Sequence, residues 1–266
     1  MSARIKKQKT PVGIILVIIL ILGAGVWFIT SDKTPEKDTE DTTPDEVVPA
    51  TPLVIYPDIT TTDKKINEGG PSTDYLIAVT YPILATADAK YTANIGTMNT
   101  NIASRASSLI SDFKSQLEGI LVSSSDDQSS LLVNSDVVQS GAIVTVAYTI
   151  SQYASGAAHP LSFIDTVSYD IRTGEILGLG DLFVANSDYL AKISSKSREL
   201  LIKKLGASEK ETIDAGTTAE EENFSVFEFT DNGLVLIFNP YQVAPYSAGI
   251  IEITIPWNQL PERSVN

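Results

Sequence analysis

The chain has 266 residues, a formal charge of −14 at pH 7, one histidine and no cysteine. This length is enough to bury one large core or two small ones. The absence of cysteine excludes disulfides, thiol nucleophiles, zinc sites with cysteine ligands and a lipidated cysteine. The first ten residues carry +4, so the remainder carries −18. This acidity disfavours nucleic acid as a partner. It either attracts a cationic protein or only keeps the domain soluble.

The chemistry of a known active site is also missing. The sequence contains no H-E-x-x-H, EF-hand, Walker A, G-x-G-x-x-G or G-x-S-x-G pattern, and one histidine cannot build a His-rich zinc site. Ser155 lies four residues before His159, and Asp165 is the nearest orienting carboxylate. That spacing does not bring hydroxyl and imidazole together without a special turn. We therefore expect no enzyme, metal or cofactor; a hydrolase built on His159 is the least favoured alternative.

The N-terminal region indicates a membrane anchor. Eighteen apolar or glycine residues run from Val12 to Ile29 and suffice to cross a bilayer as a helix. Trp27 suits the outer interface, and the basic residues before the run place the N-terminus in the cytoplasm. A cleaved signal peptide would have a shorter apolar region followed by small residues. We therefore predict a short basic cytoplasmic tail (1–10), an uncleaved single-pass anchor (11–30) in the cell membrane and an extracytoplasmic C-terminal domain.

Residues 31–52 are rich in Thr, Pro, Asp and Glu. With almost nothing to bury, they are predicted to form a disordered acidic linker. The first folded elements are expected after residue 53. Residues 75–81 are β-branched and aromatic and predict a strand that ends at Pro82. From residue 88 to 117, apolar residues recur every three or four positions, which predicts a helix with one buried stripe.

The second half alternates strand and helix signals. Residues 131–138 and 143–153 predict a hairpin, followed by a strand over 161–171. A helix is expected over 187–205, capped by Asn186 or Ser187 and ended by Gly206. Residues 207–222 are expected to be loop. Asp231-Asn232-Gly233 predicts a hairpin turn between 224–230 and 234–238, and 249–256 the last strand. The expected class is α+β, an antiparallel sheet with two helices on one face.

Two loops attract attention as binding candidates. His159 follows the small residues Gly156-Ala157-Ala158, so its ring either pins a tight bend or recognises a ligand. The loop 239–247 contains two prolines that stiffen it, with Tyr241 and Tyr246 offering large amphipathic contact areas. It either binds a partner or closes one end of the core.

Four motifs carry a family resemblance. They are Tyr153-Ala-Ser-Gly-Ala-Ala-His-Pro160, Asp170-x-x-Thr-Gly-Glu175, Gly180-Asp181-Leu-Phe183 and Tyr241-x-Val-Ala-Pro-Tyr246-x-x-Gly249, the last continuing to Ile255-Pro256. Their order and spacing resemble an RsiV-like extracytoplasmic family of unknown function, also found N-terminal to some peptidoglycan deacetylases. The resemblance covers roughly residues 145–260, and about 73–120 is similar to the partner region that precedes it. It places a boundary between an N-terminal region (53–140) and a C-terminal domain (141–266).

The resemblance implies an envelope module that binds a lysozyme-type muramidase or associates with peptidoglycan. The sequence shows no sigma-binding region and no deacetylase domain, so we expect neither sigma capture nor deacetylation. The ligand-binding candidates are His159, Tyr153, Gly156, Tyr241, Tyr246 and Asp181. The alternative is a scaffolding or assembly protein that binds another membrane protein, which an exposed hydrophobic patch would favour.

Overall fold

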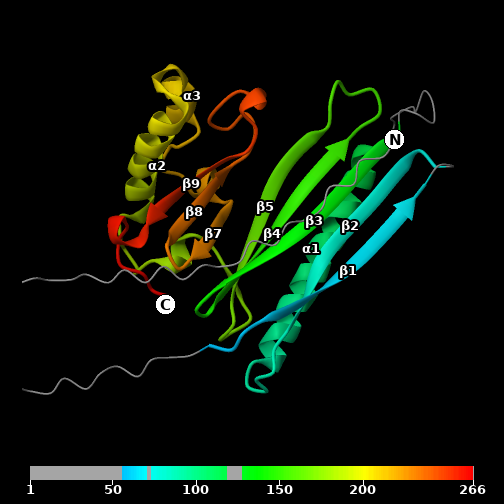
Figure 1. The fold of residues 1–266 in the computed structure, drawn as a ribbon, viewed down its shortest axis with the longest axis horizontal. Coiled ribbons are helices and arrows are strands. Elements are labelled where there is room, and N and C mark those ends of the chain that lie inside the picture. Colours follow the sequence, from blue (N-terminus) through cyan, green and yellow to red (C-terminus); the bar gives the residue numbers. More distant parts are fainter. Residues whose placement is uncertain (1–55, 71–72, 119–127, 266) are drawn as a thin grey trace, which may run out of the picture. The chain divides into compact units, whose positions relative to one another are not determined.

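One long helix covers a six-stranded sheet in the first half of the described chain (Figure 1). The computed structural model describes residues 56–70, 73–118 and 128–265. The strands lie in sequence order: β1 (Thr60–Gly69), β2 (Tyr75–Ala85), β3 (Ser129–Ser140), β4 (Ile143–Tyr153), β5 (Leu161–Asp170) and the short β6 (Ile176–Leu177). Helix α1 (Thr92–Gln116) connects β2 to β3. We call residues 56–177 the first lobe.

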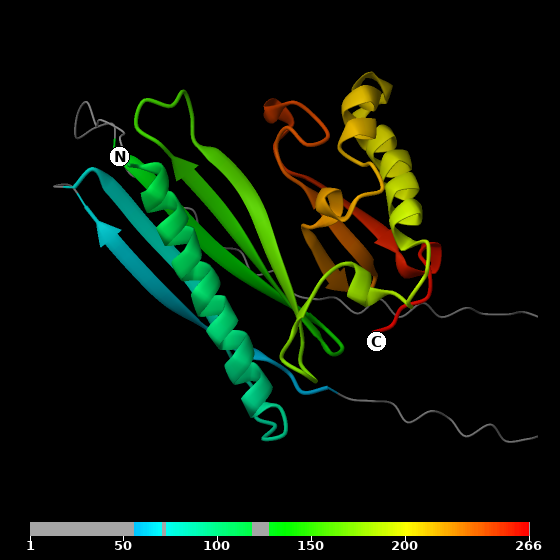
Figure 2. The same ribbon diagram turned by 180° about the vertical axis from the view of Figure 1, so that it is seen from behind.

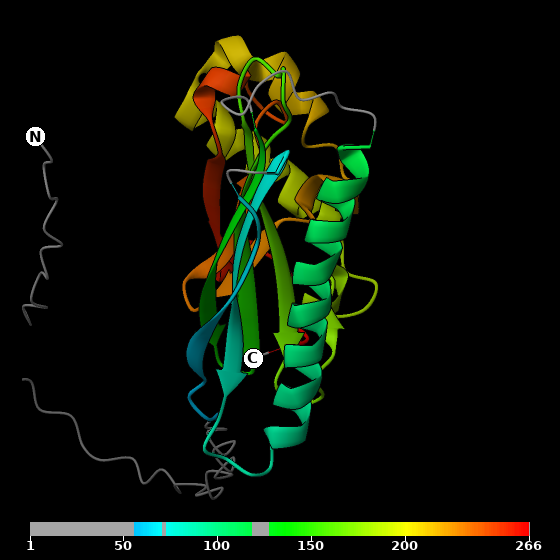
Figure 3. The same ribbon diagram turned by 90° about the vertical axis from the view of Figure 1, so that its right-hand side faces the viewer.

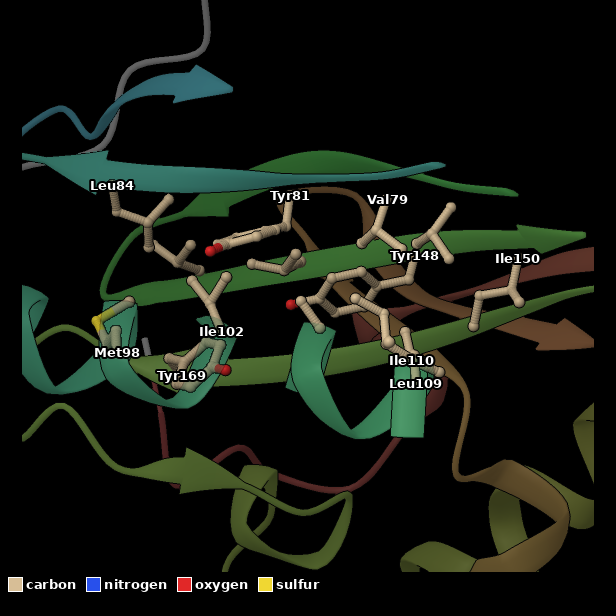
Figure 4. Packing of buried hydrophobic residues seen from close by; sticks show 14 of the residues in the cluster. Val79, Tyr81, Leu84, Met98, Ile102, Leu109, Ile110, Tyr148, Ile150 and Tyr169 are labelled. Carbon is tan, nitrogen blue, oxygen red and sulfur yellow. The ribbon is translucent and has the colours of Figure 1, made fainter. Parts of the chain in front are cut away.

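The predicted helical stripe is confirmed, and it forms the core of this lobe. Ile95, Met98, Ile102, Ala106, Leu109 and Phe113 are all buried along α1. They pack against inward-facing strand residues such as Val79, Tyr81 and Tyr148, which point into the space between helix and sheet in Figure 4. Figure 2 shows α1 lying across the strands on this one face. The three- and four-residue steps of the sequence therefore report a real buried face.

A second sheet follows, with helices of its own. Strands β7 (Phe227–Thr230), β8 (Gly233–Phe238) and β9 (Ile251–Pro256) form a three-stranded antiparallel sheet. Helix α2 (Tyr189–Leu205) packs on it and α3 (Lys210–Ala215) packs on α2. We call residues 178–265 the second lobe; its core contains five phenylalanines, at positions 183, 224, 227, 229 and 238.

The prediction of one antiparallel sheet with two helices on one face is therefore wrong in its details, although the α+β class is confirmed. The helices are divided between two sheets, as Figure 3 shows for α1 seen beside its strands. Strands β2 and β3 are parallel because a helix connects them. The first sheet ends at the two-residue β6, beyond which the Asn239 side chain bonds the edge of β5 and the N–H of Phe227 donates to the hydroxyl of Thr166 on β5.

Several local predictions need correction. Strand β2 continues through Pro82, which lies beyond Val79, the last residue that pairs with β3, so a missing N–H is tolerated there. Strand β1 is polar and exposed, so its sequence lacks the alternation of apolar and polar residues that predicts a strand. The segment 207–222 contains α3 and two short 3₁₀ helices. Asp188, not Asn186 or Ser187, is the N-cap of α2.

Other predictions are confirmed. The β3–β4 and β7–β8 hairpins pair as expected, and Gly206 ends α2 with a φ of 98°. The predicted division after residue 140 falls in the turn of the β3–β4 hairpin, so residues on both sides contribute strands to the first sheet. Contacts group the chain from Pro52 onward into one compact unit.

The predicted anchor, with Val12, Trp27 and Ile29, and the predicted linker lie outside the described residues. Within the ranges 56–70, 73–118 and 128–265, no helix is long and apolar enough to cross a membrane.

Candidate functional site

Three of the six candidate residues meet at one end of β5. His159 precedes β5, and its ring stacks on Tyr246 at a centroid distance of 4.3 Å and an angle of 28°. Tyr241 lies 5.5 Å from Tyr246, ring centre to ring centre. We call His159, Tyr241 and Tyr246 the aromatic cluster. It joins two loops more than 80 residues apart, which the sequence had suggested separately.

Hydrogen bonds hold the two loops of the cluster together. The hydroxyl of Tyr246 donates to the carbonyl of Pro160 at 2.7 Å. The Nδ1 atom of His159 lies 3.0 Å from the same carbonyl. Because a carbonyl only accepts, this second contact is a hydrogen bond when Nδ1 carries the proton. In that tautomer the imidazole would pin the bend, and the ring is also exposed to solvent.

Asn239 fixes the tyrosine loop to the edge of β5. Its side-chain oxygen accepts from the N–H of Ile164 at 2.7 Å, and its side-chain nitrogen donates to the carbonyl of Ile164 at 2.8 Å. The amide thereby replaces a neighbouring strand at this position. No sequence pattern marks Asn239 as a contact residue, apart from its place directly before Pro240.

The far side of the tyrosine loop is anchored in the second lobe. Gln242 donates from its side chain to the carbonyls of Asn223, at 2.8 Å, and Gly216, at 3.3 Å. Val243 and Ala244 are buried. A Cβ on Gly216 would lie 2.0 Å from the carbonyl oxygen of Gln242, so only glycine permits this approach. The loop is therefore held rigidly while its aromatic tip faces solvent.

Tyr241 sits in a strained conformation. Its φ is 73°, in the left-handed region that non-glycine residues rarely adopt, and its side chain is 62% exposed. Such a backbone costs on the order of 1–3 kcal/mol and occurs preferentially at ligand-binding positions. A large exposed aromatic residue kept in a costly conformation is evidence for a role outside folding.

The remaining candidates lie elsewhere or serve the backbone. Gly156 has a φ of 84° and open space around its Cβ position, so its glycine suits the turn. Tyr153 is half-buried at the end of β4. Asp181 follows β6, at the opposite end of β5 from His159. Its carboxylate accepts from the N–H of Gly178 at 2.8 Å.

Two of the four motifs are explained by packing alone. Asp170 is buried and forms a forked pair with Arg172. Gly174, at a φ of 79°, approaches the backbone of Asn94 so closely that a Cβ would lie 2.9 Å from its carbonyl oxygen. In the Gly180–Phe183 motif, a Cβ on Gly180 would meet the hydroxyl of Tyr189 at 2.9 Å. These motifs build turns, whereas the other two expose aromatic rings.

The arrangement Ser155–His159–Asp165 does not form a relay in this structure. Asp165 accepts from Arg105 of α1, with Nη2 at 2.6 Å and Nε at 2.8 Å. His159 stacks on Tyr246 instead. Within the described residues no group of three or more His, Cys, Asp or Glu side chains is placed to hold a metal ion.

Comparison with known proteins finds similarity over part of the chain. Residues 180–258, which lie in the second lobe, match the family model described as "Protein of unknown function (DUF3298)". The peptidoglycan-N-acetylmuramic acid deacetylase PdaC of Bacillus subtilis (strain 168) is 34% identical over 113 residues. That match covers 42% of this chain and 24% of the relative, so the chain corresponds to about a quarter of its length.

Two crystal structures of DUF3298 family proteins have a similar fold. The protein from Bacteroides fragilis matches with a TM-score of 0.51 and 16% identity over 76% of this chain and 91% of its own. The protein from Pseudomonas aeruginosa PAO1 gives the same score and identity, over 77% and 92%. At this identity the likeness shows the fold alone.

Proposed function

We propose that the protein is a binding module of the bacterial cell envelope, anchored by residues 12–29, whose aromatic cluster contacts peptidoglycan. The observation that carries this proposal is the stack of His159, Tyr246 and Tyr241, in which His159 and Tyr241 are exposed and Tyr246 is half-buried, on loops that are otherwise firmly fixed. Exposed, rigid tyrosine rings offer apolar area at low entropic cost and pack well on the apolar faces of sugar rings. The similarity to a peptidoglycan deacetylase supports this ligand class.

A lysozyme-type muramidase is the second candidate ligand, since the RsiV-like resemblance implies lysozyme binding. Three carboxylates support it: Asp136 on β3, Glu228 on β7 and Glu252 on β9. The charges of Asp136 and Glu252 both raise the pKa of Glu228, after the larger effect of burial. Together with the net charge of −14, they would attract a basic protein, with an affinity that falls as salt is added.

The test is calorimetric titration of the full chain, in nonionic detergent, with soluble peptidoglycan fragments and with a panel of lysozymes. We expect saturable binding to glycan and a loss of about tenfold or more in Tyr241→Ala and His159→Ala, which corresponds to about 1.4 kcal/mol. Leu132→Ala is the matched control, because Leu132 is also exposed, at 41%, on the sheet face opposite α1.

Tyr241→Gly separates binding from folding. Glycine adopts the φ of 73° without strain, so this variant should be at least as stable as the native chain while it loses glycan binding. Glycan binding that survives both Tyr241→Gly and His159→Ala would refute the role of the cluster. Salt-dependent binding to lysozyme alone would favour the second candidate, and loss in Leu132→Ala alone would favour a scaffolding surface on the sheet.

A further inference from the structure

A hollow in the surface lies along β5, well away from the aromatic cluster. It has a volume of about 410 Å³ and is lined by β5 around Val167, by the segment 176–179 and by Glu221, Glu222 and Phe227 of the second lobe. We call it the β5 groove. Val167 is seven residues from Pro160, so at ~3.4 Å per residue the groove lies roughly 20 Å from the cluster. Its volume falls in the range of ligand-binding pockets, ~300–1,000 Å³.

The groove exists because β6 is short and a hydrogen-bonded turn follows it. Strand β6 pairs only with Ser168 and Tyr169. Past it, the carboxylate of Asp181 holds the N–H of Gly178. On the opposite wall, the hydroxyl of Tyr189 donates to Glu221. Burial and this hydrogen bond raise the pKa of Tyr189 to about 12, so the hydroxyl remains a donor throughout the physiological range.

The interior and the rim of the groove differ in chemistry. Five apolar side chains contribute to the lining, together with Thr166, Ser168 and Ser225, and Ile176 at its border is 55% exposed. Glu221 and Glu222 are the only charged residues among those that line it, and both are exposed. An apolar channel with carboxylates at its mouth is complementary to an aliphatic chain that ends in a positive charge.

We propose that the β5 groove binds a lysine side chain presented by an extended polypeptide. The methylene groups of lysine lie on Leu177 and Phe227, and its ammonium group pairs with the carboxylates of Glu221 and Glu222. The exposed side chain of Ile176 contacts the polypeptide on either side of the lysine. A free polyamine offers the same aliphatic ammonium chemistry, but its second charge would lie unpaired against the apolar lining, which is costly.

This site is independent of the proposed glycan site. No residue of the aromatic cluster lines the groove. The two proposals therefore stand or fall separately, and a variant of one site serves as a control for the other.

The experiment is a titration of the ¹⁵N-labelled full chain, in nonionic detergent at low salt, with the capped tripeptide acetyl-Ala-Lys-Ala-amide. The amide signals of Gly178 and Leu179 are followed by NMR. We expect saturable shifts of these signals, and none with the same tripeptide carrying norleucine in place of lysine, which keeps the aliphatic chain and lacks the charge. Spermidine, titrated separately, tests the free-polyamine source.

Variants assign the carboxylates. Glu221→Gln combined with Glu222→Gln should weaken binding at least about tenfold, since it removes both negative charges that pair with the ammonium group. Glutamine at position 221 still accepts from Tyr189, so the wall is kept. The control is Glu209→Gln with Glu211→Gln, which changes the net charge equally outside the groove; it should alter the affinity less than about twofold.

Three results would overturn the proposal. The first is equal binding of the lysine and norleucine tripeptides, or of neither. The second is an equal loss in the control pair, which would indicate general electrostatic attraction. The third is saturable binding of spermidine without binding of the lysine tripeptide, which would assign the groove to free polyamines. Tyr241→Ala should leave all these titrations unchanged.

Discussion

The two lobes achieve helix-on-sheet packing with different side chains. The first core lies under the single helix α1 and includes four buried tyrosines, at positions 81, 91, 148 and 169. The second core, between β7–β9 and α2, uses five phenylalanines and no buried tyrosine. Phe224 and Phe238 meet there edge to face at 6.3 Å. The first core thus buries aromatic hydroxyl groups that need partners, whereas the aromatic rings of the second core carry none, although the second lobe also buries Ser194, Ser197 and Thr217.

The joint between the lobes combines apolar packing with hydrogen bonds, because Ala142 and Ile143 of the first lobe are buried in the second core. Asn239 clamps Ile164, the N–H of Phe227 donates to the Thr166 hydroxyl, and Ser140 donates to Asp231. Directional hydrogen bonds of this kind fix orientation more than they add stability. This difference indicates where binding sites can form. The cores hold the helices and strands in place, and both proposed sites lie along β5, where the hydrogen-bonded part of the joint leaves side chains accessible.

The largest expected effects come from the cores. Phe238→Ala in the second core should lower the free energy of unfolding by about 3–5 kcal/mol, and Met98→Ala in the first core by about 2–5 kcal/mol. Urea unfolding of the full chain with Trp27→Phe, so that Trp257 is the only tryptophan, reports the second lobe by fluorescence and both lobes by circular dichroism.

If the lobes unfold as one unit, both probes shift together in both variants. A Met98→Ala change that moves only part of the dichroism transition and leaves Trp257 fluorescence in place would show two separate units. A loss below about 1 kcal/mol in either variant would contradict the packing described for that core.

The next effect tests the joint. Asn239→Ala removes two hydrogen bonds and leaves both backbone groups of Ile164 without their partner, so we expect a loss of about 2 kcal/mol. The fluorescence and dichroism transitions should also move apart. Asn134→Ala on the exposed face of β3 is the control and should change stability by less than about 0.5 kcal/mol. Equal effects of the two substitutions would refute the clamp.

The sequence allows the prediction of those elements whose signals are local. The α1 stripe, the Asp231-Asn232-Gly233 turn and Gly206 at the end of α2 each depend on a few neighbouring residues, and the structure confirms them. The split into two sheets was not predictable in this way. It depends on contacts between residues more than 60 positions apart in the sequence. The Asn239 side chain bonds the edge of β5, and the Thr166 hydroxyl on β5 accepts from the second lobe.

The candidate sites divide in the same manner. His159 is the lone histidine, and Tyr241 and Tyr246 each follow a proline, so these residues were predictable as candidates although their stacking was not. The β5 groove consists of ordinary apolar residues and two glutamates in an acidic chain. Only the short β6 and the turn after it bring them together, so no sequence pattern could indicate this groove.

A smaller effect on stability concerns one buried hydroxyl group in the first core. The hydroxyl of Tyr148 is fully buried and has no hydrogen-bond partner among the described residues. Burial raises the pKa of Tyr148, which keeps the hydroxyl protonated. Tyr148→Phe removes the unpaired hydroxyl and should raise the free energy of unfolding by about 1 kcal/mol. Tyr148→Ala, which also removes the ring, should lower it by about 3–5 kcal/mol. A loss of stability in Tyr148→Phe would mean that the hydroxyl has a partner.

The smallest effect concerns the carboxylates at the joint. Half-burial first, then the charges of Glu252 and Asp136, raise the pKa of Glu228 above its ordinary value near 4.5. Between that ordinary value and the raised one, the folded state binds more protons than the unfolded state, so this group makes the protein more stable as the pH falls through that window. At neutral pH its ionised form costs stability.

Glu228→Gln should therefore stabilise the protein at pH 7. The gain should be about 0.5 kcal/mol, because solvent screens a group that is only half-buried, and it should shrink as the pH falls toward 4.5. Urea unfolding at pH 7, 6, 5 and 4.5 measures this dependence. Glu211→Gln on α3, exposed and outside the joint, is the matched control and should show a flat profile. A pH-independent gain would show that the pKa of Glu228 is not raised in the folded state.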